Sequence, residues 1–230
     1  MQVEEWSLAK RRELTPYLIT EALSEDDVVQ LEDIINSAED ERSIQELLAQ
    51  KPHILGSLLG GDERYSIPKQ KLGTEYVTDF LLCHADSLGA NWTLVELETP
   101  RSSVTIKSSN ELEKHARKGL SQIAEWRVWL ENNLAPARQP VKEHGLGLVD
   151  IPPSPPGIVL VGRRDLLLQN HEDVRKPIAV ERRVHIHTYD WLLQQLRGTL
   201  LFRGPPAANP FSIHRRTSQS AESSEDDDGF

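Results

Sequence analysis

The chain has 230 residues, of which 38% are hydrophobic, and its formal net charge is -10. This length and hydrophobic content are enough for one sizeable α/β core with smaller appendages. Five of the negative charges lie between Glu222 and Asp228, which leaves -5 for the rest of the chain. The acidic balance argues against a protein that coats nucleic acid with a broadly basic surface, so any such contact must use a localised basic patch.

The cellular compartment is constrained by three features of the sequence. No run reaches the roughly 18 apolar residues that a membrane-spanning helix needs. Residues 1–5 lack the basic-then-apolar order of a signal peptide. The single cysteine, Cys83, cannot form an internal disulfide, and its apolar neighbours predict burial. We therefore expect a cytoplasmic protein that makes no membrane contact.

Two helices are predicted in the first quarter of the chain. Ser24 and the acidic residues after it have the pattern of a helix start, and Val28 and Leu31 then follow at helical spacing. Residues 1–40 are accordingly interpreted as a helical extension. A second helix is predicted to begin at Ser43, which forms a capping-box pattern with Glu46.

Three β-rich stretches follow, at residues 64–70, 76–84 and 91–98. Gly73 and the turn-forming segment 86–89 separate them. Short connections of this kind favour neighbouring strands that run in opposite directions. We therefore expect an antiparallel meander.

The second half of the chain begins with a long predicted helix, for which Ser108 and Glu111 form a capping-box pattern. Further predicted elements are a loop at 135–157 that holds six prolines, a buried strand at 157–162, a half-exposed strand at 183–188, a short helix at 189–197 and a disordered acidic tail at 204–230. The predicted fold class is α/β, with a mixed β-sheet and flanking helices.

Carboxylates gather on two of the predicted strands. Successive strand residues point to opposite faces, so Glu96 and Glu98 share one face. Asp79 interrupts the apolar run of the preceding strand, where an unpaired charge would be costly to bury. If the two strands form a hairpin, all three carboxylates can converge at one sheet edge and hold Mg²⁺ or Mn²⁺. A metal site of this kind favours phosphodiester hydrolysis.

A plainer interpretation of the same residues stays open. Glu96 and Glu98 would then lie on a solvated strand face and pair with Lys107 or with an arginine. Asp79 would be a satisfied polar residue near a strand end. Spacing alone does not separate this interpretation from a metal site.

Several short segments resemble, in order and spacing, the PD-(D/E)xK nuclease core of the Shedu anti-phage defence family, C-terminal domain. The segments that carry the resemblance are Thr78-Asp79-Phe80-Leu81-Leu82, Leu94-Val95-Glu96-Leu97-Glu98-Thr99-Pro100 and Gln122-Ile123-Ala124-Glu125-Trp126, with weaker matches at 44–55, 158–163 and 184–193. The resemblance runs from about residue 41 to about 197, and it places a nuclease-like domain at 41–203.

The resemblance implies a restriction-endonuclease-like core and a Mg²⁺- or Mn²⁺-dependent endonuclease that cleaves DNA in phage defence. It implies that Asp79, Glu96 and Glu98 are catalytic metal ligands, and that Gln122 is a catalytic residue beside them, one helical turn from Trp126. For both Gln122 and Trp126 the alternative is a structural role, as a surface glutamine and a core tryptophan. The family also suggests a homo-oligomer.

This chain departs from the family pattern at Glu98. Where the family usually has Glu-x-Lys, this chain has Glu96-Leu97-Glu98, so a positive charge near the attacked phosphate is missing. Lys107 or Lys114 would be a relocated replacement, or simply a surface lysine. Two other functions remain open on this ground: an inactive nuclease-fold module for nucleic-acid binding or assembly, and a regulatory subunit of another enzyme.

The remaining candidates are polar residues outside the motif. Glu46 is a candidate member of the metal shell, and the Arg163–Arg164 and Arg182–Arg183 pairs are candidates for phosphate contact. His185 and His187 share a strand face and are weaker candidates for nucleic-acid contact.

Overall fold

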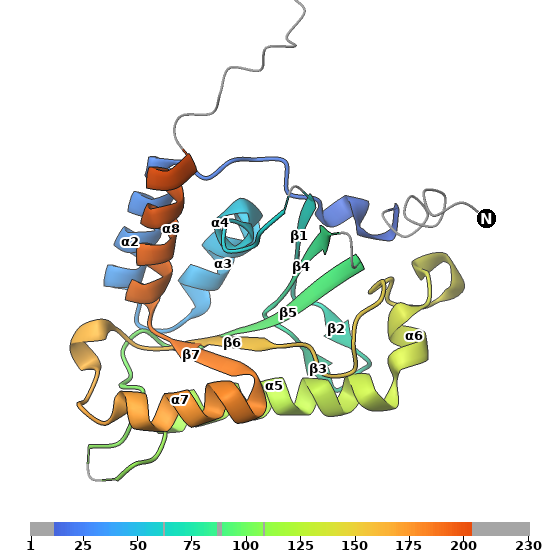
Figure 1. The fold of residues 1–230 in the computed structure, drawn as a ribbon. Helices are drawn as coiled ribbons and strands as arrows, with labels where there is room; N and C mark the ends of the chain where they lie inside the picture. The colour runs from blue at the N-terminus through green and yellow to red at the C-terminus, as the bar shows by residue number, and fades with distance from the viewer. Residues whose placement is uncertain (1–11, 62, 87–88, 108, 204–230) are drawn as a thin grey trace, which may run out of the picture.

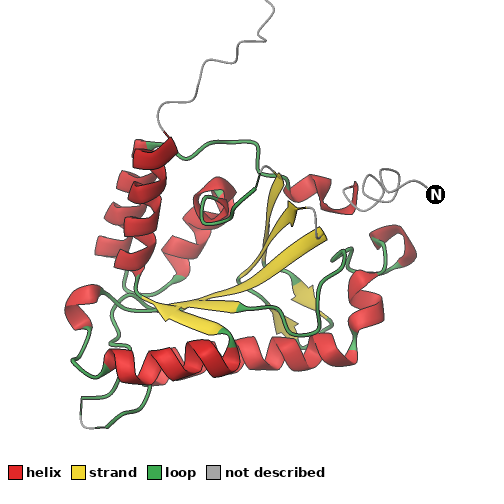
Figure 2. Cartoon of the chain, in the orientation of Figure 1, coloured by secondary structure: helices red, strands yellow, loops and turns green. Residues whose placement is uncertain are grey.

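The computed structural model describes residues 12–61, 63–86, 89–107 and 109–203. A mixed sheet in the order β1-β4-β5-β6-β7 crosses the centre of the molecule, and helices cover both of its faces (Figures 1 and 2). The predicted fold class, α/β with a mixed sheet and flanking helices, is confirmed. The strands are β1 (Glu63–Pro68), β2 (Lys71–Leu72), β3 (Tyr76–Val77), β4 (Phe80–Asp86), β5 (Gly89–Leu97), β6 (Gly157–Leu160) and β7 (Val184–His187).

The helices lie in two layers. In Figure 1, α5 and α7 run along one face of the sheet, and α2, α3, α4 and α8 cover the other. The α-helices are α2 (Glu25–Ser37), α3 (Arg42–Gln50), α4 (Pro52–Gly56), α5 (Lys114–Asn132), α6 (Leu134–Arg138), α7 (His171–Arg182) and α8 (Tyr189–Arg203), and the short 3₁₀ turns are η1 (Thr15–Tyr17), η2 (Val141–Glu143) and η3 (Arg164–Leu166).

The predicted meander is confirmed, with one difference. Strands β1, β4 and β5 pair antiparallel, whereas β5, β6 and β7 pair parallel. The stretch 76–84, predicted as one strand, is divided at Thr78 and Asp79: β3 pairs with β2 in a separate small sheet, and β4 begins at Phe80. At this interruption of the strand, the Asp79 carboxylate accepts the backbone N–H of Leu97 across the sheet at 2.9 Å.

Each face of β5 packs into its own core. Trp92 and Leu94 pack with the buried residues of α5, whereas Val95 and Leu97 pack with those of α2, α3 and α8. This alternation follows from the two-residue period of a strand. It puts Glu96 and Glu98 on the α5 side, as the period predicts.

Helix α2 confirms the start predicted at Ser24. The Ser24 hydroxyl accepts the N–H of Asp27, and the Asp27 carboxylate accepts the N–H of Ser24. Val28 and Leu31 are buried in the core that α8 also lines. The division into an extension at 1–40, a domain at 41–203 and a tail stays a prediction, and the tail at 204–230 lies outside the described residues.

The capping boxes predicted for α3 and α5 do not mark the observed starts of these helices. Helix α3 begins at Arg42, so Ser43 lies inside the first turn and caps nothing. Helix α5 begins at Lys114, capped by Glu113, because a β-bridge between Thr105 and Leu112 holds the chain extended just before it. Ser108 itself lies outside the described residues.

The proline-rich segment 135–157 is more ordered than the predicted loop. It contains η2 and most of α6, and its backbone is tied to the core: the Trp92 indole donates to the Val149 carbonyl at 2.8 Å. Cys83 is buried, as expected. Within the part of the chain that the structure describes, no helix is long and apolar enough to cross a membrane.

Candidate active site

Asp79 lies at the break between β3 and β4, where the small sheet meets the large one. Besides the Leu97 N–H, its carboxylate accepts a hydrogen bond from the Gln45 side-chain amide and lies 3.1 Å from the Lys69 ammonium. Lys69 has a left-handed backbone (φ 51°), an uncommon conformation for a residue other than glycine. Each Asp79 oxygen therefore already has a partner, and the side chain is held in one orientation.

Glu96 is buried beside Asp79 on β5, with only 3% of its surface exposed. Burial, and next the negative charges of Asp79 and Glu98, raise the pKa of Glu96 to about 10. Its Oε2 atom is fully buried and has no hydrogen-bond partner among the described residues. A buried acceptor without a partner is costly, which points to a group that would satisfy it.

Glu98 follows the end of β5, where its N–H donates to the Leu160 carbonyl. Its carboxylate is fully buried and meets two basic side chains of α5: Lys118 Nζ lies 2.9 Å from Oε1, and His115 Nδ1 lies 3.3 Å from Oε2. The Tyr189 hydroxyl donates to the Glu98 carbonyl at 2.8 Å, which pins this point of the chain from α8.

Helix α5 supplies the wall opposite the carboxylates. Lys118 and Gln122, one turn apart, line a cavity of about 190 Å³ together with Asp79 and Glu96. Buried Gln122 Oε1 has no hydrogen-bond partner among the described residues. Trp126, the next residue along this row, is a core side chain with 1% exposure. Glu98 is not among the residues that line the cavity.

The donor atoms of this cavity are suited to a hard cation. Mg²⁺ takes oxygen ligands and is held in proteins by one or two carboxylates plus waters. Asp79 and Glu96 supply two carboxylates, and Glu96 Oε2 and Gln122 Oε1 are buried oxygen atoms without a hydrogen-bond partner among the described residues, as is Glu98 Oε1, which has only its ion pair with Lys118. No group of three His, Cys, Asp or Glu side chains among the described residues is arranged to hold a metal. Glu98, expected as the third carboxylate, instead contacts Lys118 and His115.

Comparison with known proteins identifies the family to which the chain belongs. The family model described as "Shedu protein SduA, C-terminal" matches residues 38–193, more than half of the chain. The chain belongs to this family. No curated protein matches it. A solved structure titled "Structure of restriction endonuclease FokI bound to DNA" is similar at a TM-score of 0.38 and 12% identity, and the similarity covers 87% of this chain and 31% of that one.

The resemblance identified from the sequence is thus confirmed for the Shedu family. Its motif segments lie where they can meet: Asp79 before β4, Glu96 on β5, Gln122 on α5 and Tyr189 at the start of α8. The cavity is also lined by polar residues that the sequence does not single out: Asp40, Glu41, Arg42, Gln45, Lys69 and Lys118. Only the helical spacing of Lys118 and Gln122 was available beforehand as a signal.

Other candidates of this Shedu family member lie away from the cavity. Lys107, Lys114 and Glu46 are exposed and do not line it, and Gln45 occupies the place on α3 that was considered for Glu46. His185 and His187 lie on edge strand β7, where the rings stack and His187 stacks in turn on Trp191 at 3.7 Å.

Neither arginine pair lines the cavity. Arg163 donates to both oxygens of Asp190 at 3.0 Å and to Asn36, which joins the end of β6 to α8 and α2. The backbone carbonyls of Arg182 and Arg183 accept hydrogen bonds from the Arg127 guanidinium. The Arg163 guanidinium is thus already bound to Asp190 and Asn36, and phosphate contact by these arginines stays a prediction.

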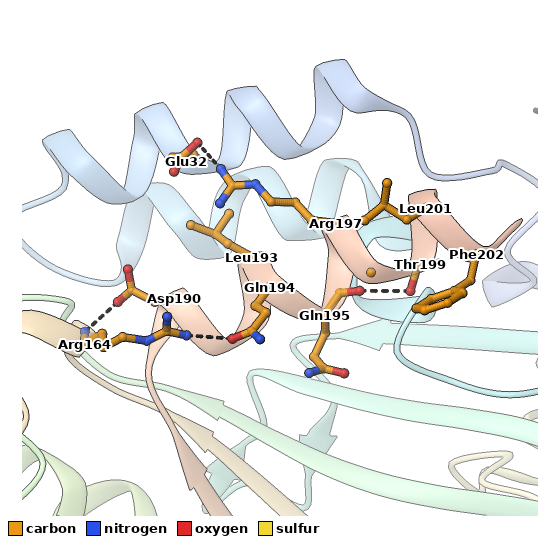
Figure 3. Close-up of a pocket in the computed structure, with 11 residues that line it drawn as sticks. Glu32, Arg164, Asp190, Leu193, Gln194, Gln195, Arg197, Thr199, Leu201 and Phe202 are labelled. Atoms are coloured by element: carbon orange, nitrogen blue, oxygen red, sulfur yellow. Dashed lines mark hydrogen bonds and ion pairs between the residues drawn. The ribbon is translucent and has the colours of Figure 1, made fainter. Parts of the chain in front are cut away.

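A larger cavity, of about 770 Å³, lies along the outer side of α8 (Figure 3). Its charged side chains face partners of their own: Arg197 pairs with Glu32 of α2 at 2.5 Å, and Arg164 donates to Gln194 at 2.7 Å. It contains none of the Shedu motif carboxylates. Size alone does not make it the site of the chemistry.

Proposed function

We propose that this chain is a metal-dependent nuclease that cleaves DNA phosphodiester bonds in anti-phage defence. The observation that supports this most strongly is the pair of Asp79 and Glu96, which line one cavity, with one buried Glu96 oxygen that has no hydrogen-bond partner among the described residues. A structural carboxylate buried to this degree would normally be satisfied by the protein itself. Membership of the Shedu family supports the substrate and the biological role.

In this proposal Asp79, Glu96 and Gln122 hold Mg²⁺ or Mn²⁺, and the ion supplies an activated water and charge stabilisation at the phosphate. Gln45 and Leu97 N–H fix the Asp79 carboxylate, so the ligand set is oriented before the ion binds. Homo-oligomerisation remains a further proposal from the family resemblance.

The test is a DNA cleavage assay with Mg²⁺ and Mn²⁺ on the wild type, Asp79→Asn and Glu96→Gln. Glu46→Gln is the matched control, because Glu46 is an exposed carboxylate on α3 outside the cavity. We expect cleavage by the wild type and the control, and a loss of about 10²-fold or more in the two site variants. In calorimetric titrations with the metal alone, the heat of binding seen for the wild type should be absent in the same two variants. A wild type that is inert with both metals would contradict the proposed nuclease activity.

A further inference from the structure

Glu98 and Lys118 form an ion pair that bears on the missing motif lysine. Lys118 Nζ, on α5, lies 2.9 Å from Oε1 of Glu98, which follows the end of β5. Glu98 is fully buried and does not line the cavity, whereas Lys118 does line it and is half exposed. Lys118 therefore pairs with a carboxylate outside the cavity while it lines the cavity together with Asp79 and Glu96.

The backbone of α5 is shaped for this approach. Gly119 follows Lys118, and a Cβ atom at this position would lie 2.7 Å from Val159 Cγ1 and 3.4 Å from Glu98 Cγ. The absence of a side chain thus lets the helix lie close to β5 and β6. Lys118 reaches Glu98 because the helix is this close to the sheet.

We infer that Lys118 is the catalytic cation of this site and that Glu98 is a positioning residue that holds it, rather than a metal ligand. Phosphodiester cleavage develops negative charge on the phosphate oxygens, and a fixed ammonium group nearby stabilises that charge. In this arrangement the motif lysine has been exchanged for a glutamate on the strand and a lysine on the helix. The inference rests on the proposed nuclease function.

Arg42 and Lys69 also line the cavity, and half-exposed Lys69 is the rival lysine for this role. Its ammonium group lies against Asp79, one of the proposed metal ligands, at 3.1 Å. A bound cation would compete with Lys69 for that carboxylate. Lys118 has its own carboxylate outside the cavity and can keep its position when a cation binds. Lys69→Met should therefore tighten metal binding, whereas Lys118→Met should not.

Charge around Lys118 explains what Glu98 contributes. The acidic groups that face Lys118 are Glu98 and Glu96 on β5 and Glu41 before α3. Burial alone would lower the pKa of Lys118, but the hydrogen bond and charge of Glu98 raise it. Glu98→Gln should therefore move the alkaline limb of the kcat/KM profile to lower pH. Glu98→Asp, which keeps the charge, should move this limb less than Glu98→Gln does. A merely structural role of Glu98 would not move the limb with charge in this way.

The decisive experiment compares Lys118→Met with Lys118→Arg and with Lys114→Met, an exposed lysine on the same helix outside the cavity. We expect Lys118→Met to lower kcat by about 10²–10³-fold with little change in KM, Lys118→Arg to keep part of the activity, and Lys114→Met to cleave like the wild type. Equal activity of the two methionine variants would overturn the assignment.

A second readout does not need cleavage. In an Asp79→Asn background, affinity for a short DNA duplex is measured by fluorescence anisotropy over a range of salt. Losing a phosphate contact should reduce the slope of log K against log salt by about 1 in Lys118→Met, and Lys114→Met should leave the slope unchanged. If the wild type never cleaves, the proposed function fails, and this slope still decides whether Lys118 meets phosphate. An unchanged slope in Lys118→Met would overturn that contact.

Discussion

Glu96 illustrates how a buried carboxyl group makes the stability of the fold depend on pH. Its pKa is raised from 4.5 to about 10, mainly by burial, so the protonated form is favoured in the folded protein. The stability this gives is fully present below pH 4.5 and is lost as the pH rises towards 10. Without a cation, the folded protein should therefore weaken between these two pH values.

Glu96→Gln should remove this loss, because the amide has the same shape and no charge to bury. In a chelator, the melting temperature of the variant should exceed that of the wild type by a margin that grows from about pH 5 to about pH 9. A gain of about 1 kcal/mol corresponds to about 2–4 °C for a chain of this size. Thermal melts at several pH values measure the margin, and Mg²⁺ should close it by stabilising the wild type alone. A margin independent of pH would contradict this explanation.

The same residue scale shows what the sequence could and could not predict at the site. Glu96 and Glu98 were placed on one face by the strand period, and Asp79 was marked by its apolar neighbours, because both signals are local. The partner of Glu98 was not predictable, because Lys118 is 20 positions away and meets it only through the packing of α5 on the sheet. Lys107 and Lys114 were named instead, being nearer in sequence.

At the scale of elements, α7 is a helix that the sequence pattern does not predict. It has no buried residue, so it has no apolar stripe to give a helical period, and Pro177 lies inside it. Its packing comes from partly buried Val174 and Ile178, which touch the core below β7. The strands and α5 were predictable because each has a buried face, whereas helix ends depended on tertiary contacts such as the Thr105–Leu112 bridge.

Helix α5 offers a test of close packing at Gly119. Gly119→Ala gains up to about 1 kcal/mol of helix propensity, but its methyl group would collide with Val159, a stiff and fully buried side chain. Overpacking of this kind costs about 1–3 kcal/mol, so we expect a net loss of stability in chemical denaturation. Gly198→Ala on α8 is the matched control: a Cβ there meets nothing within 4 Å, so it should stabilise by about 1 kcal/mol. Stabilisation by both substitutions would show that α5 can move away from the sheet at no cost.

On the scale of the whole molecule, helices that end before residue 204 already cover both faces of the sheet. Leu192, Leu193 and Leu196 of α8 are buried against α2 and the sheet. Towards the end of the same helix, Leu201 and Phe202 are 81% and 92% exposed. The core thus depends on the first part of α8, and its last turn adds little to it.

Deletion of residues 204–230 should therefore leave the melting temperature nearly unchanged, since the buried part of α8 lies well before the cut. The segment carries five acidic residues between Glu222 and Asp228, which repel DNA phosphates, so its removal should strengthen DNA binding most at low salt, where charges are least screened. A full-length variant with those five residues changed to Asn or Gln separates charge from length, and it should bind like the deletion. Melting curves and anisotropy titrations measure the two effects. A large drop in melting temperature would instead mean that the segment covers Leu201 and Phe202, and equal DNA binding by all three proteins would remove the electrostatic role.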